Sequence, residues 1–309
     1  MTEADTLIAI LVATFRAGTP LVFAALGELI TEKSGVLNLG LEGMMLTGAV
    51  AGFVATVLTG SPVIGILAGM VAGMVMALIF GVLTLTLQAN QVASGLALSI
   101  FGIGLSAFLG LNYIGTPIQG LAPIAIPGLS TIPLVGPLLF AQDPLIYVSL
   151  VMFGLVSWFL YRTRGGLILR AVGESHGSAH AIGYSVIRIR YLAVLFGGAM
   201  SGLAGAYLSL VYTPQWTENM TAGRGWIALA LVVFATWKPG RVLLGAYLFG
   251  GVTIIGLHIQ AAGFDVPSQL LSTLPYLATV LVLVLISRDA TKIRLNAPAS
   301  LGKAFHPDG

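Results

Sequence analysis

The chain has 309 residues, of which 57% are hydrophobic and only 8% are charged. A soluble domain carries about 25% charged residues, so this chain has too few charges to cover a water-facing surface. It contains no cysteine, which excludes disulfides, thiolate metal sites and cysteine nucleophiles. The net charge of +3 is not a nucleic-acid signal, because the basic residues collect in short loops.

Apolar runs of about 20 residues, the length that crosses a bilayer as an α-helix, recur along the chain. They predict an all-α, polytopic transmembrane bundle of about nine spans, with eight to ten compatible with the pattern. The acidic N-terminus MTEADT shows no feature of a cleavable signal peptide. The expected spans are residues 6–26, 37–58, 62–87, 91–111, 144–161, 191–212, 225–237, 242–260 and 270–287.

The positions of the basic residues predict the orientation, because basic residues concentrate in cytoplasmic loops. Placing the loop 162–190 inside puts twelve of the fourteen Lys and Arg residues on the inner side. This favours an outside N-terminus and an inside C-terminus in a multi-pass protein of the cell membrane, in contact with membrane lipid. We expect residues 1–290 to form the transmembrane domain and residues 291–309 to form a short, weakly ordered cytoplasmic tail.

Between the first two spans lies a polar stretch, GELITEKSGVLNLGLEGMM, residues 27–45. Its glycines allow a broken helix, which is tolerated at membrane depth only inside protein or beside a water-filled cavity. Asn38 and Glu42 would share a face if the second half is helical, and they either line a substrate pathway or hold the broken helix by hydrogen bonds. Glu28, Glu32 and Lys33 are expected near the membrane interface.

Two loops differ in kind from simple connectors. Residues 112–143 are rich in proline, which breaks helices, so we expect an irregular outer loop that is either a connector or a docking surface. The inner loop 162–190 spends nearly thirty residues where a connector needs about two to eight. Within it, AVGESHGSAHAIG predicts a short helix that ends at Gly183. This helix is either an amphipathic surface helix or a contact for a soluble partner.

A second polar stretch, TPQWTENMTAGRGW, covers residues 213–226. Its resemblance in composition to the stretch 27–45 hints at corresponding interrupted segments in two halves of a transporter. Trp216 is a residue of the membrane-interface belt or a stacking platform, and Glu218 and Asn219 are weaker pathway candidates. Arg16, inside the first span, is expected to pair with one of these carboxylates, since an unpaired buried charge is costly.

Catalytic signatures are missing. The chain has no GxxxxGK[ST] loop for ATP, no HExxH, no Ser/His/Asp arrangement and no histidine cluster at metal spacing. The GxG at Gly102 and Gly104 and the GLAGA at 202–206 are read as faces for close helix packing. We therefore expect no cofactor and no metal, and a transporter or channel rather than an enzyme.

Two long motifs carry a family resemblance over about residues 15–290. RAVGES…A…IGY…IR followed by SGLAGAYLSL resembles the membrane subunits of binding-protein-dependent ABC importers in the ribose and branched-chain amino-acid branch. ALGELITEKSGVLNLGLEGMMLTGA is similar to the nucleoside permeases, whose external receptors are basic-membrane-protein lipoproteins. His176 and His180 stand where the coupling loop usually has polar residues.

The resemblance implies a function and partners. The chain would be a non-catalytic permease subunit that moves nucleosides with energy from a separate cytoplasmic ATPase. Its other partners would be a second permease subunit and an extracytoplasmic substrate-binding lipoprotein. Gly173, Glu174 and Gly183 would form the coupling helix, and Arg170 would add a charge at the ATPase interface or at lipid headgroups. Import of a sugar or amino acid, and an ion-driven secondary transporter, are the alternatives.

Overall fold

The computed structural model describes all residues except 1–2, 131, 133–134, 262–266, 288–295 and 307–309. The described residues form helices and no strands, as the composition predicts. The longer helices are α1 (Glu3–Lys33), α2 (Leu41–Thr59), α3 (Pro62–Gly81), α4 (Gln91–Gly110), α6 (Pro144–Arg162), α9 (Val186–Tyr207), α11 (Pro239–Ala261) and α12 (Ser268–Ser287). The shorter ones are α5 (Val135–Leu139), α7 (Arg164–Glu174), α8 (His176–Ala181), α10 (Arg224–Phe234), a 3₁₀ turn at Leu111–Tyr113, and π-helical turns at Val82–Thr86 and Leu208–Tyr212.

Seven helices of the described part are long and apolar enough to cross a membrane, so the predicted count of about nine is not confirmed. The expected span 225–237 is α10, an 11-residue helix. At about 1.5 Å per residue α10 covers roughly half of a bilayer core about 30 Å thick. The expected span 270–287 is helical as α12, which is not among the seven.

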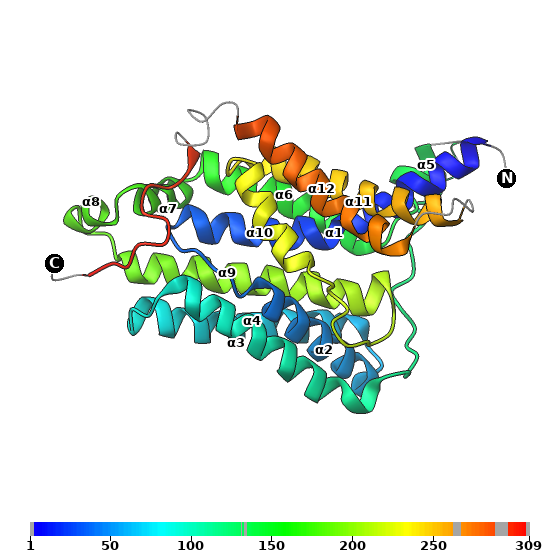
Figure 1. The fold of residues 1–309 in the computed structure, drawn as a ribbon, viewed down its shortest axis with the longest axis horizontal. Helices are drawn as coiled ribbons and strands as arrows, with labels where there is room; N and C mark the ends of the chain where they lie inside the picture. Colours follow the sequence, from blue (N-terminus) through cyan, green and yellow to red (C-terminus); the bar gives the residue numbers. More distant parts are fainter. Residues whose placement is uncertain (1–2, 131, 133–134, 262–266, 288–295, 307–309) are drawn as a thin grey trace.

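The core is built around α1 and α9, which run side by side through the middle of the bundle (Figure 1). On one side α9 packs against α2 and α3, and on the other α1 packs against α6, α10 and α11. Every residue from Ala17 to Glu32 and from Gly197 to Leu210 is buried. Apart from Glu28 and Glu32, these two stretches are largely apolar on all sides, as expected of helices at the centre of a bundle.

Glycines bring the central helices into backbone contact. A Cβ at Gly48 of α2 would lie 2.4 Å from the Cα of Gly202 in α9, which confirms the predicted packing face at 202–206. A Cβ at Gly102 of α4 would lie 2.4 Å from the Cα of Gly43, whereas Gly104 has no atom within 4 Å. The GxG motif is therefore a packing device at its first glycine only.

The two ends of the bundle differ. The start of α1 and the short α5 lie at one end, and α7, α8 and the last described residues lie at the other, called here the coupling end after the coupling helix that the sequence predicts there (Figure 1). The outer loop 112–143 is irregular apart from α5 and the end of the 3₁₀ turn, as its prolines predict. Residues 296–306 correct one expectation, because this part of the tail packs against α1, α7 and α9 rather than standing free.

Candidate functional site: a buried junction of two broken helices

The carboxylate of Glu42 joins the two polar stretches. Glu42 lies in the first turn of α2, is 2% exposed, and accepts hydrogen bonds from Thr221 Oγ1 at 2.5 Å, Gly223 N at 2.9 Å and Gly225 N at 2.6 Å. The two N–H groups belong to the start of α10, where a helix has unpaired donors and the positive end of its dipole. A side chain at Gly225 would collide with Glu42, so glycine is needed there. The two polar stretches are thus in direct contact, while their predicted correspondence as interrupted segments of two halves stays a prediction.

Asn38 holds the break between α1 and α2. Its side-chain oxygen accepts from Gly40 N at 2.9 Å, its amide contacts Met44 Sδ at 3.5 Å, and its backbone N–H donates to Glu28 Oε1 at 3.2 Å. Since α2 begins at Leu41, Asn38 is not helical and shares no helix face with Glu42. Asn38 is fully buried, and its side chain stabilises a turn of the kind that Asn favours.

Glu28 and Glu32, expected near the membrane interface, are both completely buried within the protein, because α1 continues to Lys33. Glu32 accepts a hydrogen bond from the indole N–H of Trp237, and Lys33 donates to the carbonyl of Asn296 at 2.8 Å. These partners lie more than 200 residues away in the sequence. Each carboxylate has one oxygen that accepts a hydrogen bond from the protein, while Glu28 Oε2 and Glu32 Oε1 have no such partner among the described residues.

A cavity of about 430 Å³ lies beside the junction, between α10, α11 and α12. This volume is within the range of small-molecule sites, about 300–1,000 Å³. Ala222 and Arg224 form part of its wall, and the residue between them, Gly223, is held by Glu42. The polar side chains that line the cavity are Arg224, Thr253, Gln260 and Tyr276, among the apolar Ile227, Leu257, Leu271 and Pro275.

A second cavity, of about 330 Å³, lies between α1, α6, α7 and α9. Its wall contains only apolar side chains, such as Met152, Phe159 and Phe196. Specific small-molecule sites combine an apolar wall with a few placed polar groups. The cavity beside the junction has this combination, and the apolar one does not.

The other predicted pathway residues have separate environments. Trp216 is fully buried against Gly110, Leu46, Phe53 and Leu210, so it is neither an interface-belt residue nor an open stacking platform. Glu218 and Asn219 are exposed. Arg224 lies with its guanidinium 5.5 Å from the ring centre of Tyr212 and donates to the carbonyls of Met220 and Thr221.

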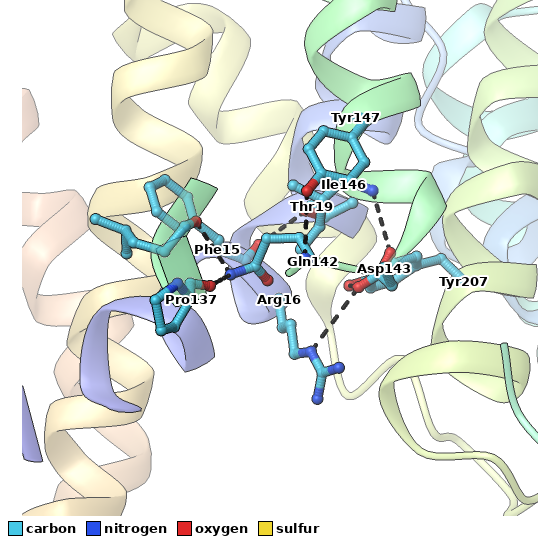
Figure 2. A network of polar contacts seen from close by, with 10 residues as sticks. Phe15, Arg16, Thr19, Pro137, Gln142, Asp143, Ile146, Tyr147 and Tyr207 are labelled. Carbon is cyan, nitrogen blue, oxygen red and sulfur yellow. Dashed lines mark hydrogen bonds and ion pairs between the residues drawn. The ribbon is translucent and has the colours of Figure 1, made fainter. Parts of the chain in front are cut away.

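Arg16 pairs with a carboxylate that sequence reasoning had placed in the outer loop. Its Nε lies 3.9 Å from Asp143 Oδ2, and Tyr207 OH donates to the same oxygen at 3.1 Å (Figure 2). Asp143 Oδ1 accepts from Ile146 N at 3.1 Å and caps α6. Burial raises the pKa of the Asp143 carboxyl, against the lowering effect of these donors. The Asp-Pro pair before an apolar run was the available sequence signal, since it is a helix start.

The inner loop forms two helices rather than the single predicted one, because Ser175 interrupts them and its side chain accepts from Ser178 N. Gly173 is buried at the end of α7, where a Cβ would lie 2.2 Å from the Lys33 carbonyl oxygen. Glu174 is exposed and follows it. Gly183, at φ +92°, ends α8 with hydrogen bonds typical of a Schellman motif, as predicted.

Arg170 is half-buried and places its guanidinium 5.5 Å from the ring centre of Tyr161. Four residues were predicted to contact a partner, and all of them lie at the coupling end, on or next to α7 and α8: Arg170, Gly173, Glu174 and Gly183. The junction and its cavity lie elsewhere in the bundle. Among the described residues, no three His, Asp or Glu side chains come together as a metal site.

The comparisons with known proteins agree with this architecture. The family model for "Branched-chain amino acid transport system / permease component" matches residues 10–286. The putative glucose ABC transporter permease protein TsgC13 of Haloferax volcanii is 41% identical over 95% of this chain and 96% of its own length. No solved structure matches.

Two further relatives carry another substrate in their names. The guanosine ABC transporter permease protein NupQ of Bacillus subtilis is 32% identical over 88% of this chain and 89% of its own. The nucleoside ABC transporter permease protein NupC of Lactococcus lactis is 31% identical over 86% and 88%. Permeases of this kind are non-catalytic and work with an ATPase and a substrate-binding protein. The chain belongs to the branched-chain amino acid transport system permease family, and it is a multi-pass plasma-membrane subunit of an ABC importer.

Proposed function

We propose that this permease imports solutes that carry a sugar ring, and nucleosides first among them. The relatives are named for guanosine, nucleosides, glucose and, over a shorter match, fructose. A sugar ring with several hydroxyls is the chemical group that these solutes share. The single structural observation that supports the proposal is the cavity beside the Glu42 junction, whose wall combines polar and apolar side chains.

The cavity wall suits such a solute. Arg224 and Gln260 can donate to hydroxyl oxygens, and Thr253 and Tyr276 offer hydroxyl groups beside apolar surface on which a ring or base can rest. No carboxylate is among the described residues that line the cavity. The ammonium group of an amino acid would therefore lose its water there without gaining an anion, which is costly.

The sequence-predicted pathway residues take different parts in this proposal. Asn38, Glu42 and Trp216 are buried and would shape the wall of the pathway rather than bind the solute directly. Glu218 and Asn219 are exposed in the loop before α10 and would lie at its mouth. The solute would shift the transporter between states only by binding them with different affinity.

At the coupling end, we propose that α7 and α8 contact the ATPase subunit. Glu174 would supply a charge-assisted hydrogen bond and Arg170 a second charge, while Gly173 and Gly183 fix the close approach and the end of α8. A second permease subunit would complete the pathway, and an extracytoplasmic lipoprotein would deliver the solute.

A free monosaccharide is the second candidate. The specific observation in its favour is that the 41% identical relative is named a putative glucose permease, above the two nucleoside permeases in identity. A free monosaccharide would fill less of the cavity than a nucleoside, because it lacks the base.

Uptake by cells that lack the gene tests the proposal. We expect import of labelled nucleosides to fall and to return with the wild-type gene. Gln260→Ala should reach the membrane and raise the half-saturation concentration for uptake several-fold, whereas Gln215→Ala, an exposed glutamine outside the cavity, should not. Loss of glucose uptake alone would select the second candidate. Loss of valine or leucine uptake alone would contradict the sugar-ring proposal.

A further inference from the structure

Residues 296–306, called here the C-terminal strap, cross the coupling end of the bundle (Figure 1). Ser300 N donates to the carbonyl of Gly173 at 2.8 Å, and its hydroxyl donates to the carbonyl of Glu174 at 3.2 Å. Two residues later, Gly302 N donates to the carbonyl of Gly35 at 3.1 Å. The strap therefore bonds both to the end of α7 and to the break that precedes α2.

Phe305 anchors the far end of the strap. Its side chain is 8% exposed and packs with Val172 of α7, Ala179 of α8 and Val186 of α9. The rings of His176 and His180 meet it edge to face, with centroids 5.4 Å and 5.3 Å from its own. Such aromatic pairs prefer this geometry and add to the apolar burial. Phe305 therefore packs against α8, whereas Ala297 and Leu301 of the strap pack against the main core.

Arg190 connects the strap with the break that precedes α2. Its guanidinium is buried, with Nε donating to the Ser34 carbonyl at 3.2 Å and Nη1 donating to the Lys303 carbonyl at 3.0 Å. Nη2 lies 3.4 Å from His176 Nδ1. No carboxylate of the described part forms an ion pair with it. Removing the strap would leave a buried cation short of an acceptor, which is strongly unfavourable.

From the break, fixed contacts continue to the substrate cavity. The break holds Asn38, whose backbone bonds to Glu28, and leads directly into the first turn of α2 with Glu42. Glu42 in turn holds the residues that form the α10 wall of the cavity. Coupling between distant sites needs a contiguous set of packed and hydrogen-bonded elements, and this set is contiguous from α8 to α10.

We infer that the C-terminal strap and Arg190 form a transmission link between the coupling end and the Glu42 junction. The link makes α7 and α8 move as one body with the break before α2. Movement driven by the ATPase subunit is thereby transmitted to the junction. The inference rests on the proposed function of the coupling end. It assigns Phe305 and Arg190 as positioning residues, since neither lines the cavity.

The test uses the complete importer in liposomes, with its ATPase subunit. Phe305→Ala removes the anchor but keeps the backbone bonds of the strap, and Phe305→Leu restores apolar volume. Ala304→Ser, at an exposed position in the strap, is the matched control. We expect Phe305→Ala to reduce solute transported per ATP hydrolysed at least fivefold, with basal ATPase activity within twofold of wild type. Phe305→Leu should recover most of the loss, and Ala304→Ser should show none.

A second readout needs no known substrate. Because the chain has no cysteine, Ala222→Cys places a single thiol in the cavity wall. Trapping the ATPase with ATP and vanadate should change the rate at which a water-soluble maleimide labels this thiol, and Phe305→Ala should abolish the change. If vanadate trapping changes the labelling rate in the Phe305→Ala variant as much as in wild type, the transmission link is refuted. Loss of both transport and basal ATPase activity in Phe305→Ala would also refute the link, because the strap would then serve only the assembly of the importer.

If the thiol responds as expected while no sugar or nucleoside is transported, the substrate proposal fails and the link stands. The experiment therefore distinguishes failure of the substrate proposal from failure of the transmission link.

Discussion

Replacing Glu42 is the sharpest test of the junction. Its carboxylate accepts one hydroxyl and two backbone N–H groups, all in a buried site. Each buried donor left without a partner costs about 1–3 kcal/mol, so Glu42→Ala is expected to destabilise the fold by roughly 3–9 kcal/mol if no water enters. This is a large share of a total stability of about 5–15 kcal/mol. Thr221→Val removes only one of the three partners and should cost about 1.5–3 kcal/mol.

The assay is thermal unfolding of the purified permease in detergent, followed by tryptophan fluorescence and by the fraction that remains monodisperse. The matched control is Glu218→Ala, which removes an exposed carboxylate and should change stability by less than about 0.5 kcal/mol. We expect the order Glu42→Ala, then Thr221→Val, then the control. If Glu42→Ala unfolds at the temperature of the control, the carboxylate does not hold α10, and the reasoning about the junction is refuted.

Three further predictions concern packing, the α6 cap and the strap. A Cβ at Gly205 would lie 1.8 Å from a carbonyl oxygen of α2. Gly205→Ala should therefore lower the free energy of unfolding by about 1–3 kcal/mol through overpacking and reduce the yield of folded protein. Gly104→Ala is the control and should do neither, because no atom lies within 4 Å of a Cβ there. Asp143→Ala should cost about 0.5–2 kcal/mol as a lost cap, read as a lower unfolding temperature, and Asp143→Asn should recover part of it. Burial and three neighbouring basic side chains lower the pKa of His176, so protonation of this ring opposes docking of the strap. Docking should be complete above pH 6.5 and weaken as the pH falls through the lowered pKa. Limited proteolysis of the tail at pH 7.5 and pH 5.5 measures the docking, and equal protection at the two pH values would contradict the prediction.

The helices and their packing faces could be predicted from local sequence, because each depends on neighbouring residues. Apolar runs of membrane length gave the long helices, and the small residues at 202–206 indicated the face that meets Gly48. Gly183 ends α8 by a rule that involves a single turn. The two polar stretches could also be picked out from the sequence, and the structure joins them at Glu42.

Long-range partners could not be predicted in the same way. Glu32 and Lys33 look like an interfacial pair when read locally, but their partners are Trp237 and the carbonyl of Asn296. Phe305 lies outside every apolar run of membrane length, so its packing was missed. The short expected span 225–237 runs past the end of α10 at Phe234, because Ala235 and Trp237 continue the apolar sequence.

The measurement that tests the central claim most directly is uptake by the purified importer in liposomes, with its receptor and ATPase subunit. Labelled guanosine would be offered with ATP inside, and unlabelled adenosine, ribose, free guanine and leucine would be added as competitors. We predict ATP-dependent uptake that competitors carrying a sugar ring reduce and that free guanine and leucine leave unchanged. Guanosine uptake that free guanine or leucine reduces, and that adenosine and ribose leave unchanged, would contradict the account.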